Sequence, residues 1–213
     1  MYIAIEGLDG AGKSTASRAI RDFVRERFVK NDNKDDMNKH FDEHEAITFV
    51  REPGGTPLGE ILRSIVKSEH EGETIDIRTE TLLFFASRNQ LLTNVVVPAL
   101  EAGKVVISDR CYLSSVAYQN NPLVEYLCEN ELVARPDLII YMDITPEIGL
   151  ERAKSREELD RIEQKGLDFF YKTRANYQAY ADTHDYVVTV DAHESIEDVY
   201  KAVYQVLVDW FGK

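Results

Sequence analysis

Short apolar stretches rich in Ile and Val alternate along the chain with longer segments whose apolar residues recur at helical spacing. A short continuous apolar run is typical of a strand buried on both faces, whereas the helical spacing indicates a helix with one buried face. The predicted strands are 2–6, 47–50, 104–108, 138–143 and 186–191. Strands that alternate with helices predict an α/β fold, a parallel sheet with helices on both faces.

Several helices have ends that the sequence marks. The segment 14–28 keeps its apolar residues on one face, and Ser195 is placed to cap a final helix. Thr145 reads as an N-cap because a proline and an acid follow it. The segment 79–102 predicts a long helix, and Pro98 near its end predicts a kink or break there.

One segment differs from its surroundings. Residues 30–45 are polar, acidic in balance and almost free of apolar side chains, so we expect an exposed insertion between the first helix and the second strand. We find no internal repeat and expect residues 1–213 to form a single domain.

Composition narrows the class of partner. The formal net charge is −13, which argues against a nucleic-acid or anionic-membrane surface, since both require a basic field. Two cysteines, Cys111 and Cys128, are too few for a disulfide framework, and no apolar run approaches the ~18 residues of a membrane span. We therefore expect a cytoplasmic protein whose partner is a small molecule.

A glycine-rich loop follows the first predicted strand and precedes the first helix. It fits G-x-x-x-x-G-K-[ST], the loop whose backbone N–H groups surround phosphate oxygens at a helix N-terminus. Lys13 is predicted to reach the β- and γ-phosphates of ATP, and the Ser14 hydroxyl to ligate Mg²⁺. The predicted ATP-binding residues of this loop are Gly7, Leu8, Asp9, Gly10, Ala11, Gly12, Lys13, Ser14 and Thr15.

Charged residues follow the other strands. In an open parallel sheet the ligand crevice lies at the carboxyl ends of the strands, so the loops after strands one to three should bring Asp9, Arg51 and Arg110 together. Phe84 and Arg88 lie four residues apart on one helix face. Each arginine alone is compatible with a surface salt bridge, but the set predicts an anionic ligand.

A charge-dense segment, 152–164, follows the fourth strand and its helix. It is compatible with a solvated helix that pairs Glu with Arg. Beside a phosphate loop, we favour a small lid whose arginines close over ATP and stabilise charge on the transferring phosphoryl group.

Six sequence blocks, in this order, resemble the thymidylate kinases (dTMP kinases), a family of P-loop nucleoside monophosphate kinases. They are EGLDGAGKST, REPGGTPLGE, LLFFASRNQ, SDRCYLSSVAYQ, RPDLIIYMDITPEIGLERA and ELDRIEQKGLDFF. The resemblance implies a three-layer P-loop fold with a five-stranded parallel sheet and a homodimer. It also implies transfer of the ATP γ-phosphoryl group to dTMP, giving dTDP for dTTP biosynthesis.

The resemblance also implies roles for residues of the acceptor site. Phe84 stacks on thymine, Arg88 binds the base or the substrate side of the pocket, and Arg51 and Arg110 hold the dTMP phosphate. The implied lining of the nucleoside pocket is Ser114, Tyr118 and Gln119.

The implied catalytic groups lie in the loop, the third strand end and the lid. Asp9 approaches the sugar 3′-hydroxyl and the metal, and Asp109 lies near the magnesium water shell. The family places its catalytic arginine either in the phosphate loop or in the lid. Because the loop position here is Gly10, the chain resembles the lid-arginine, bacterial-type arrangement. The implied catalytic set is Lys13, Asp9, Arg110, Arg156 and Arg161, with Arg152 assigned to ATP binding.

Three other functions stay open. A kinase of broader specificity would accept several deoxynucleoside monophosphates, and a deoxynucleoside kinase would use Glu52 as a base on thymidine. A switch or ATPase would turn over nucleotide without an acceptor. Departures from the family, namely the long 30–45 insertion, a short 120–135 stretch and Cys111 after Asp-Arg, bear on base selectivity and dimer contacts.

Overall fold

The computed structural model describes residues 1–31, 46–154 and 160–212. Its centre is a five-stranded, all-parallel sheet in the order β2-β3-β1-β4-β5. The strands are β1 (Tyr2–Glu6), β2 (Ile47–Arg51), β3 (Val105–Asp109), β4 (Leu138–Asp143) and β5 (Val187–Asp191). This confirms the α/β prediction and the five-stranded sheet.

Some strand ends differ by one residue from the prediction. β2 and β3 each extend one residue further, to Arg51 and Asp109, because these two residues pair with each other in the parallel ladder. Asp109 also pairs with Ile5 of the central strand β1. Its position is therefore fixed by two neighbouring strands at the carboxyl edge of the sheet.

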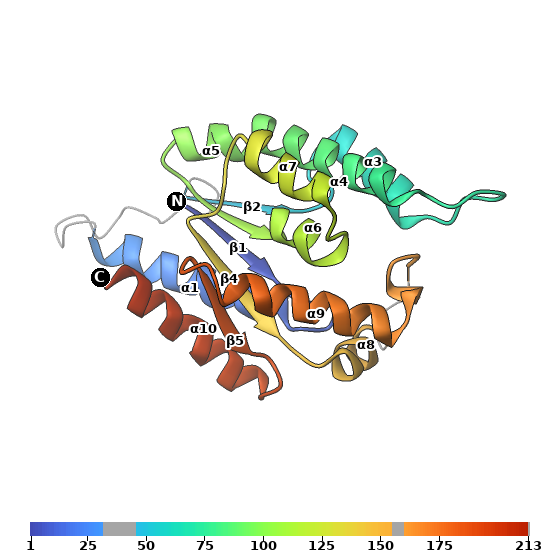
Figure 1. The fold of residues 1–213 in the computed structure, drawn as a ribbon. Coiled ribbons are helices and arrows are strands. Elements are labelled where there is room, and N and C mark those ends of the chain that lie inside the picture. Colours follow the sequence, from blue (N-terminus) through green and yellow to red (C-terminus); the bar gives the residue numbers. More distant parts are fainter. Residues whose placement is uncertain (32–45, 155–159, 213) are drawn as a thin grey trace.

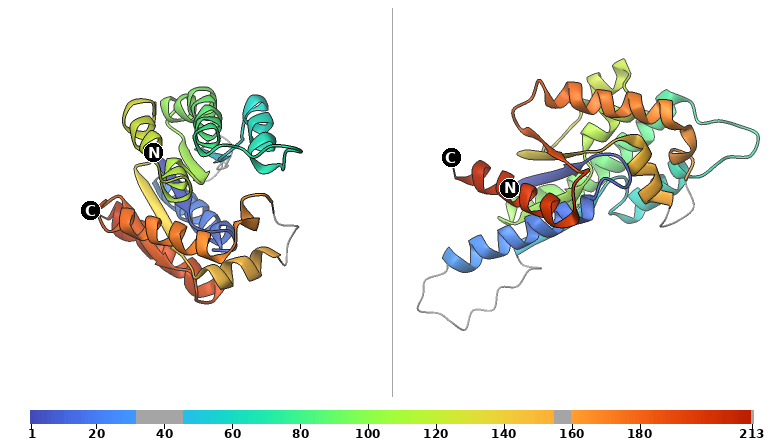
Figure 2. Two further views of the ribbon diagram at one scale, coloured as in Figure 1. Left: turned by 45° about the vertical axis from the view of Figure 1, so that its right-hand side comes forward. Right: turned by 90° about the horizontal axis from the view of Figure 1, so that it is seen from below.

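Helices cover both faces of the sheet. α1 (Lys13–Asn31) and α10 (Ile196–Phe211) pack side by side on one face, and the remaining helices lie toward the other (Figures 1 and 2). This division follows from right-handed crossovers, because only the first crossover runs toward β2 and the later ones run the opposite way. The second layer contains α3 (Pro57–Lys67), α4 (Ile77–Leu91), α5 (Val97–Glu101), α6 (Tyr112–Tyr118), α7 (Pro122–Asn130), α8 (Pro146–Lys154) and α9 (Leu167–Ala181).

The long helical run of the second layer changes from α-helical to π-helical geometry just before Pro98, where the sequence predicts a kink or break. The chain stays helical: a π-helical segment, Leu92–Val96, joins α4 to α5, and Pro98 falls in the first turn of α5. A proline within a continuous helical run removes one backbone hydrogen bond, and a π-helical turn is a distortion that occurs beside such positions. The widened turn thus accommodates Pro98 without the predicted break.

The core lies on both sides of β1, whose residues are all buried. Ile20, Phe23 and Val24 of α1 face the sheet, and the apolar positions of α10 do the same, as the helical spacing predicts. Ser195 caps α10 by accepting a hydrogen bond from the Asp198 N–H. A tightly packed β1 holds the loop after Glu6 in place.

Two predicted segments lie partly outside the described residues. Of the polar segment 30–45, the residues up to 31 continue α1 and 32–45 are not described. Of the predicted lid 152–164, residues 155–159, including Arg156, are not described. Among the helices that are described, none is both long and apolar enough to cross a membrane.

Candidate active site

The phosphate loop joins buried β1 to the first turn of α1. Its glycines Gly7, Gly10 and Gly12 have φ of 139°, 79° and 82°, in the region that favours glycine. A Cβ at Gly10 would lie 2.1 Å from the carbonyl oxygen of Gly149 in α8. The loop therefore requires glycine at position 10 for both backbone and packing reasons.

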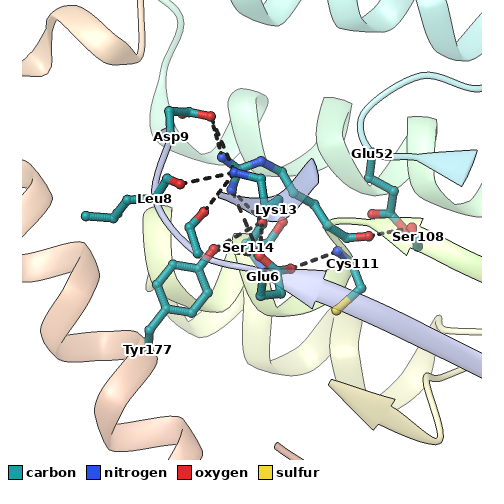
Figure 3. Close-up of polar contacts among 12 residues, drawn as sticks. Glu6, Leu8, Asp9, Lys13, Glu52, Ser108, Cys111, Ser114 and Tyr177 are labelled. Carbon is teal, nitrogen blue, oxygen red and sulfur yellow. Dashed lines mark hydrogen bonds and ion pairs between the residues drawn. The ribbon is translucent and has the colours of Figure 1, made fainter. Parts of the chain in front are cut away.

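Lys13 lies inside this loop. Its Nζ donates hydrogen bonds to the carbonyl oxygens of Gly7 (3.3 Å) and Leu8 (3.1 Å) and lies 3.7 Å from the Asp9 carboxylate (Figure 3). Burial, together with the charge of Arg110, lowers the pKa of Lys13. A cation folded back onto its own loop is placed to exchange these carbonyls for phosphate oxygens.

Arg110 connects the third strand to the loop. Its Nη2 donates to Asp9 Oδ1 at 2.8 Å and its Nη1 donates to Ser114 Oγ at 3.2 Å. Burial acts to raise the pKa of Asp9, but the charges of Arg110 and Lys13 outweigh it and hold that pKa well below its usual range. The two cations thus keep an ionised carboxylate beside the phosphate loop.

The backbone of Arg110 is strained. Its φ of 75° lies in the left-handed region, which is uncommon for a residue with a Cβ. The Arg110 N–H donates to the Ile5 carbonyl at 2.8 Å, and Ser108 Oγ donates to the Arg110 carbonyl at 2.6 Å. These hydrogen bonds hold the unusual conformation, which aims the guanidinium toward Asp9.

A carboxylate that the sequence did not single out organises this corner. Glu6, at the end of β1, is fully buried and accepts hydrogen bonds from the N–H groups of Cys111 (2.8 Å) and Ser114 (2.9 Å). The hydroxyls of Ser114 (2.8 Å) and Tyr177 (2.7 Å) also donate to it (Figure 3). Glu6 therefore ties β1 to α6 and α9 and fixes Ser114, which in turn accepts from Arg110. An acid ending an otherwise apolar strand was its only signal in the sequence.

A cavity of about 210 Å³ opens beside Lys13 and Arg110. It brings together all the residues predicted for the acceptor site and, from the phosphate loop, Lys13. Predicted residues among its lining are Asp9, Lys13, Arg51, Phe84, Arg88, Asp109, Arg110, Ser114, Tyr118 and Gln119. Residues at the ends of β1, β2 and β3 thus meet residues of α1, α4 and α6 at one edge of the sheet, as expected for a parallel α/β sheet.

Arg88 is buried, with 2% of its surface exposed, in an ion pair with Glu52. Its Nε donates to Glu52 Oε2 at 2.6 Å, and its terminal nitrogens donate to the Ser115 hydroxyl (3.2 Å) and the Cys111 carbonyl (3.1 Å). Burial raises the pKa of Glu52, although the charge and the hydrogen bond of Arg88 act to lower it. The ion pair of Arg88 is therefore buried and is not a surface salt bridge, and Arg88 forms part of the cavity wall.

Two polar atoms at the cavity have no partner among the described residues. The Tyr118 hydroxyl and Glu52 Oε1 are both buried without a hydrogen bond, and both residues line the cavity. Buried polar groups normally have hydrogen-bond partners, so buried atoms without one in a cavity wall indicate a ligand or ordered water.

Arg51, the remaining arginine of the predicted acceptor site, is half exposed and donates a hydrogen bond to Glu60 at 2.9 Å.

Several predicted residues do not line this cavity, among them most of the phosphate loop, Arg152 and Arg161. Ser14 is exposed in the first turn of α1, and Arg152 Nη1 donates to the Ala192 carbonyl at 3.1 Å. Arg161 donates to the Val66 carbonyl and to Glu80. Its guanidinium therefore contacts α3 and α4.

The protein oxygen atoms near the phosphate loop are too few to bind Mg²⁺ alone, but they suit a Mg²⁺ ion that is also bound to nucleotide phosphates. Within 1–31, 46–154 and 160–212 no group of three or more His, Cys, Asp or Glu side chains could hold a metal ion. The hydroxyl of Ser14 and the carboxylates of Asp9 and Asp109 are oxygen donors near the loop. Mg²⁺ usually combines one or two such donors with water and substrate phosphates, so these residues fit it.

The fold and the site together define a P-loop kinase with a cation-lined cavity beside its phosphate loop. The family model described as thymidylate kinase matches residues 5–203. Over 219 residues the chain is 44% identical to the thymidylate kinase of Pseudoalteromonas translucida and 41% identical to that of Vibrio parahaemolyticus, covering all of this chain and 97% of each relative. A crystal structure of thymidylate kinase from Ehrlichia chaffeensis shares the fold, with a TM-score of 0.69, 24% identity and 97% coverage of both chains. The chain belongs to the thymidylate kinase family.

Proposed function

We propose that this chain transfers the γ-phosphoryl group of ATP to dTMP, giving dTDP and ADP. The observation that carries the proposal is the cavity that joins a cationic acceptor site, with Arg51, Arg88 and Arg110, to Lys13 of the phosphate loop. Membership of the thymidylate kinase family supports the same acceptor.

The acceptor roles follow from the cavity wall. Arg110, pointing into the cavity from a strand end, is suited to the dTMP phosphate, because a guanidinium binds two oxygens of one phosphate at once. Arg51 is suited to the same phosphate once it leaves Glu60. Phe84 offers a ring face for the thymine base, and the orphaned Tyr118 hydroxyl is free to bind the nucleoside.

The chemistry needs no general base. A phosphate monoester has a second pKa near 6, so at neutral pH its oxygen is already a nucleophile. Phosphoryl transfer then depends on positioning two anions and neutralising charge as it develops. Lys13 and Arg110 supply positive charge on the two sides of the reacting oxygens, and Asp9, held ionised between them, orients both.

ATP and Mg²⁺ would be held on the loop side. The helix N-terminus and Lys13 suit the phosphates, and Ser14 with Asp109 suits the hydrated metal, which supplies charge neutralisation of the phosphates. Arg152, near the loop after β5, suits the remainder of the nucleotide.

The catalytic arginine would come from the lid. Gly10 has no room for a side chain, because Gly149 of α8 packs against it. An arginine in the loop would force the two elements apart, so Arg156 and Arg161 of segment 152–164 are the arginines left to assist the transferring group.

A homodimer is the expected assembly. Leu58, Ile61 and Ile65 form an exposed apolar stripe on α3, with 48%, 58% and 36% of each residue exposed, and Leu82 on α4 is also half exposed. A contiguous apolar patch of this kind marks an interaction surface. Size-exclusion chromatography with light scattering should therefore give the molar mass of a dimer. Ile61→Glu should shift the measured mass toward that of the monomer. A monomeric wild-type protein would contradict this assembly.

The activity is tested by coupled ADP release with ATP and Mg²⁺, offering dTMP, dUMP, dGMP, dCMP and thymidine separately. We expect turnover with dTMP, weaker turnover with dUMP, and almost none without an acceptor. Activity on thymidine but not dTMP would instead assign Glu52 as a base, and equal activity on all monophosphates would remove the thymine specificity. Hydrolysis without acceptor would indicate an ATPase.

A further inference from the structure

A buried carboxylate lies behind the base end of the cavity. Glu80, in the first turn of α4, has 1% of its surface exposed and does not itself line the cavity. Phe84 and Arg88, four and eight residues further along the same helix, do line it. Residues at this spacing share a helix face, so Glu80 is directed toward the same interior as these two.

Glu80 receives hydrogen bonds and charge from two other parts of the chain. Arg161 Nη2 donates to Oε2 at 2.5 Å, and Lys165 Nζ lies 3.6 Å from Oε1. From the end of α6, Gln119 Nε2 donates to Oε1 at 3.0 Å. Both carboxylate oxygens are therefore engaged.

The charge on Glu80 survives its burial. Burial acts to raise the pKa of Glu80, but the hydrogen bonds from Arg161 and Gln119 and the charge of Lys165 outweigh it, and the pKa is lowered. At neutral pH the group is a carboxylate, which accepts hydrogen bonds and cannot donate them.

An acceptor of this kind fixes the orientation of its partner. The Gln119 side chain has one donating and one accepting end, and facing a carboxylate it must present its NH₂ group. Its carbonyl oxygen is then left for the cavity that Gln119 lines. The acceptor pocket thus offers the Gln119 carbonyl oxygen as a hydrogen-bond acceptor at this position.

We propose that Glu80 is a positioning residue for base selectivity: by fixing the Gln119 amide, it requires the acceptor nucleobase to donate a hydrogen bond from its ring N3. The inference rests on the proposed function. Thymine and uracil carry a proton on N3, whereas the N3 of cytosine is an acceptor. Cytosine would therefore set two acceptors against each other in a buried site, which is strongly unfavourable.

Arg161, in the predicted lid 152–164, is itself held in place beside Glu80. Arg161 is also held by the Val66 carbonyl, through Nε at 3.0 Å and Nη2 at 2.8 Å, and Lys67 Nζ pairs with Asp160 at 2.7 Å. These contacts keep Arg161 beside Glu80, so the ionisation of Glu80, and with it the orientation of Gln119, depends on a residue outside the acceptor pocket.

The test compares dUMP and dCMP, because neither carries the 5-methyl group and they differ at the N3–C4 edge. Glu80→Gln keeps the shape of the side chain but can donate as well as accept, so Gln119 is released to turn either way. We expect the ratio of kcat/KM for dUMP to that for dCMP to fall about tenfold, equivalent to about 1.4 kcal/mol. Gln119→Ala should lower the same ratio, and adding Glu80→Gln to it should cause no further change.

Asp143→Asn is the matched control, because Asp143 is held by Arg174 through two hydrogen bonds of 2.8 Å and does not line the cavity. It should leave the dUMP:dCMP ratio unchanged. An unchanged ratio in a folded Glu80→Gln protein, or in Gln119→Ala, overturns the inference, as does an equal fall in the control. Wild-type protein inactive on both dTMP and dUMP would overturn the proposed function instead.

Discussion

Arg110 provides the sharpest test of the site, because one side chain joins the acceptor cavity to the phosphate loop. Arg110→Ala removes the hydrogen bonds to Asp9 and Ser114 and the guanidinium that the acceptor phosphate would meet. It also removes the largest of the charges that lower the pKa of Asp9, so that pKa should rise.

The expected loss follows from what the guanidinium does. Removing one preorganised donor aimed at developing charge typically costs 10²–10³-fold in turnover, about 2.7–4 kcal/mol. Arg110 would contact the phosphate before and during transfer, so part of the loss should appear in the KM for dTMP. We therefore expect kcat/KM for dTMP to fall by about 10³-fold, with KM for ATP changed much less. Arg110→Lys keeps the charge but not the fork, and should recover only part of the activity.

The strained backbone supplies a control that separates stability from catalysis. With φ at 75°, a residue with a Cβ costs roughly 1 kcal/mol relative to glycine. Arg110→Gly should therefore be about 1 kcal/mol more stable to denaturant than Arg110→Ala, while both are equally inactive. The assays are coupled ADP release and urea unfolding. Activity of Arg110→Ala within threefold of wild type would refute the phosphate-binding role.

Three further results are expected. Replacing Arg156 and Arg161 together by Ala should lower kcat at least about 10²-fold while KM for ATP changes little, as steady-state kinetics would show; an unchanged kcat would exclude a lid arginine. Gly10→Ala should weaken nucleotide binding in calorimetry and lower the unfolding temperature, because its Cβ would meet the Gly149 carbonyl; wild-type affinity would contradict this. Asp143 has a lowered folded-state pKa, so its stabilising contribution is present above its ordinary pKa of 3.8 and is lost as the pH falls through the lower value. As the pH is lowered, the free energy of unfolding, measured by circular dichroism, should thus fall more for wild type than for Asp143→Asn. Equal losses of stability in the two proteins would count against this role of Asp143.

Local sequence determined the elements and the phosphate loop. An apolar strand, a glycine-rich turn and a helix start are adjacent in the chain, so the pattern of residues 2–14 predicts the loop from local sequence alone. The same holds for the cap at Ser195 and for the strands, whose predicted ends differ by at most one residue. Order along the chain also brought Arg51 and Arg110 to one edge, because parallel strands align their carboxyl ends.

Tertiary structure alone decided which side chains partner one another. The sequence could not show that Glu6 binds α6 and α9, that Arg88 pairs with Glu52, or that Arg161 contacts Glu80, because each pair joins segments far apart in the chain. Such contacts are set by how layers pack, and no periodicity encodes them. The sequence by itself therefore determined the fold and the phosphate loop, whereas the orientation of the cavity side chains came from tertiary contacts between segments far apart in the chain.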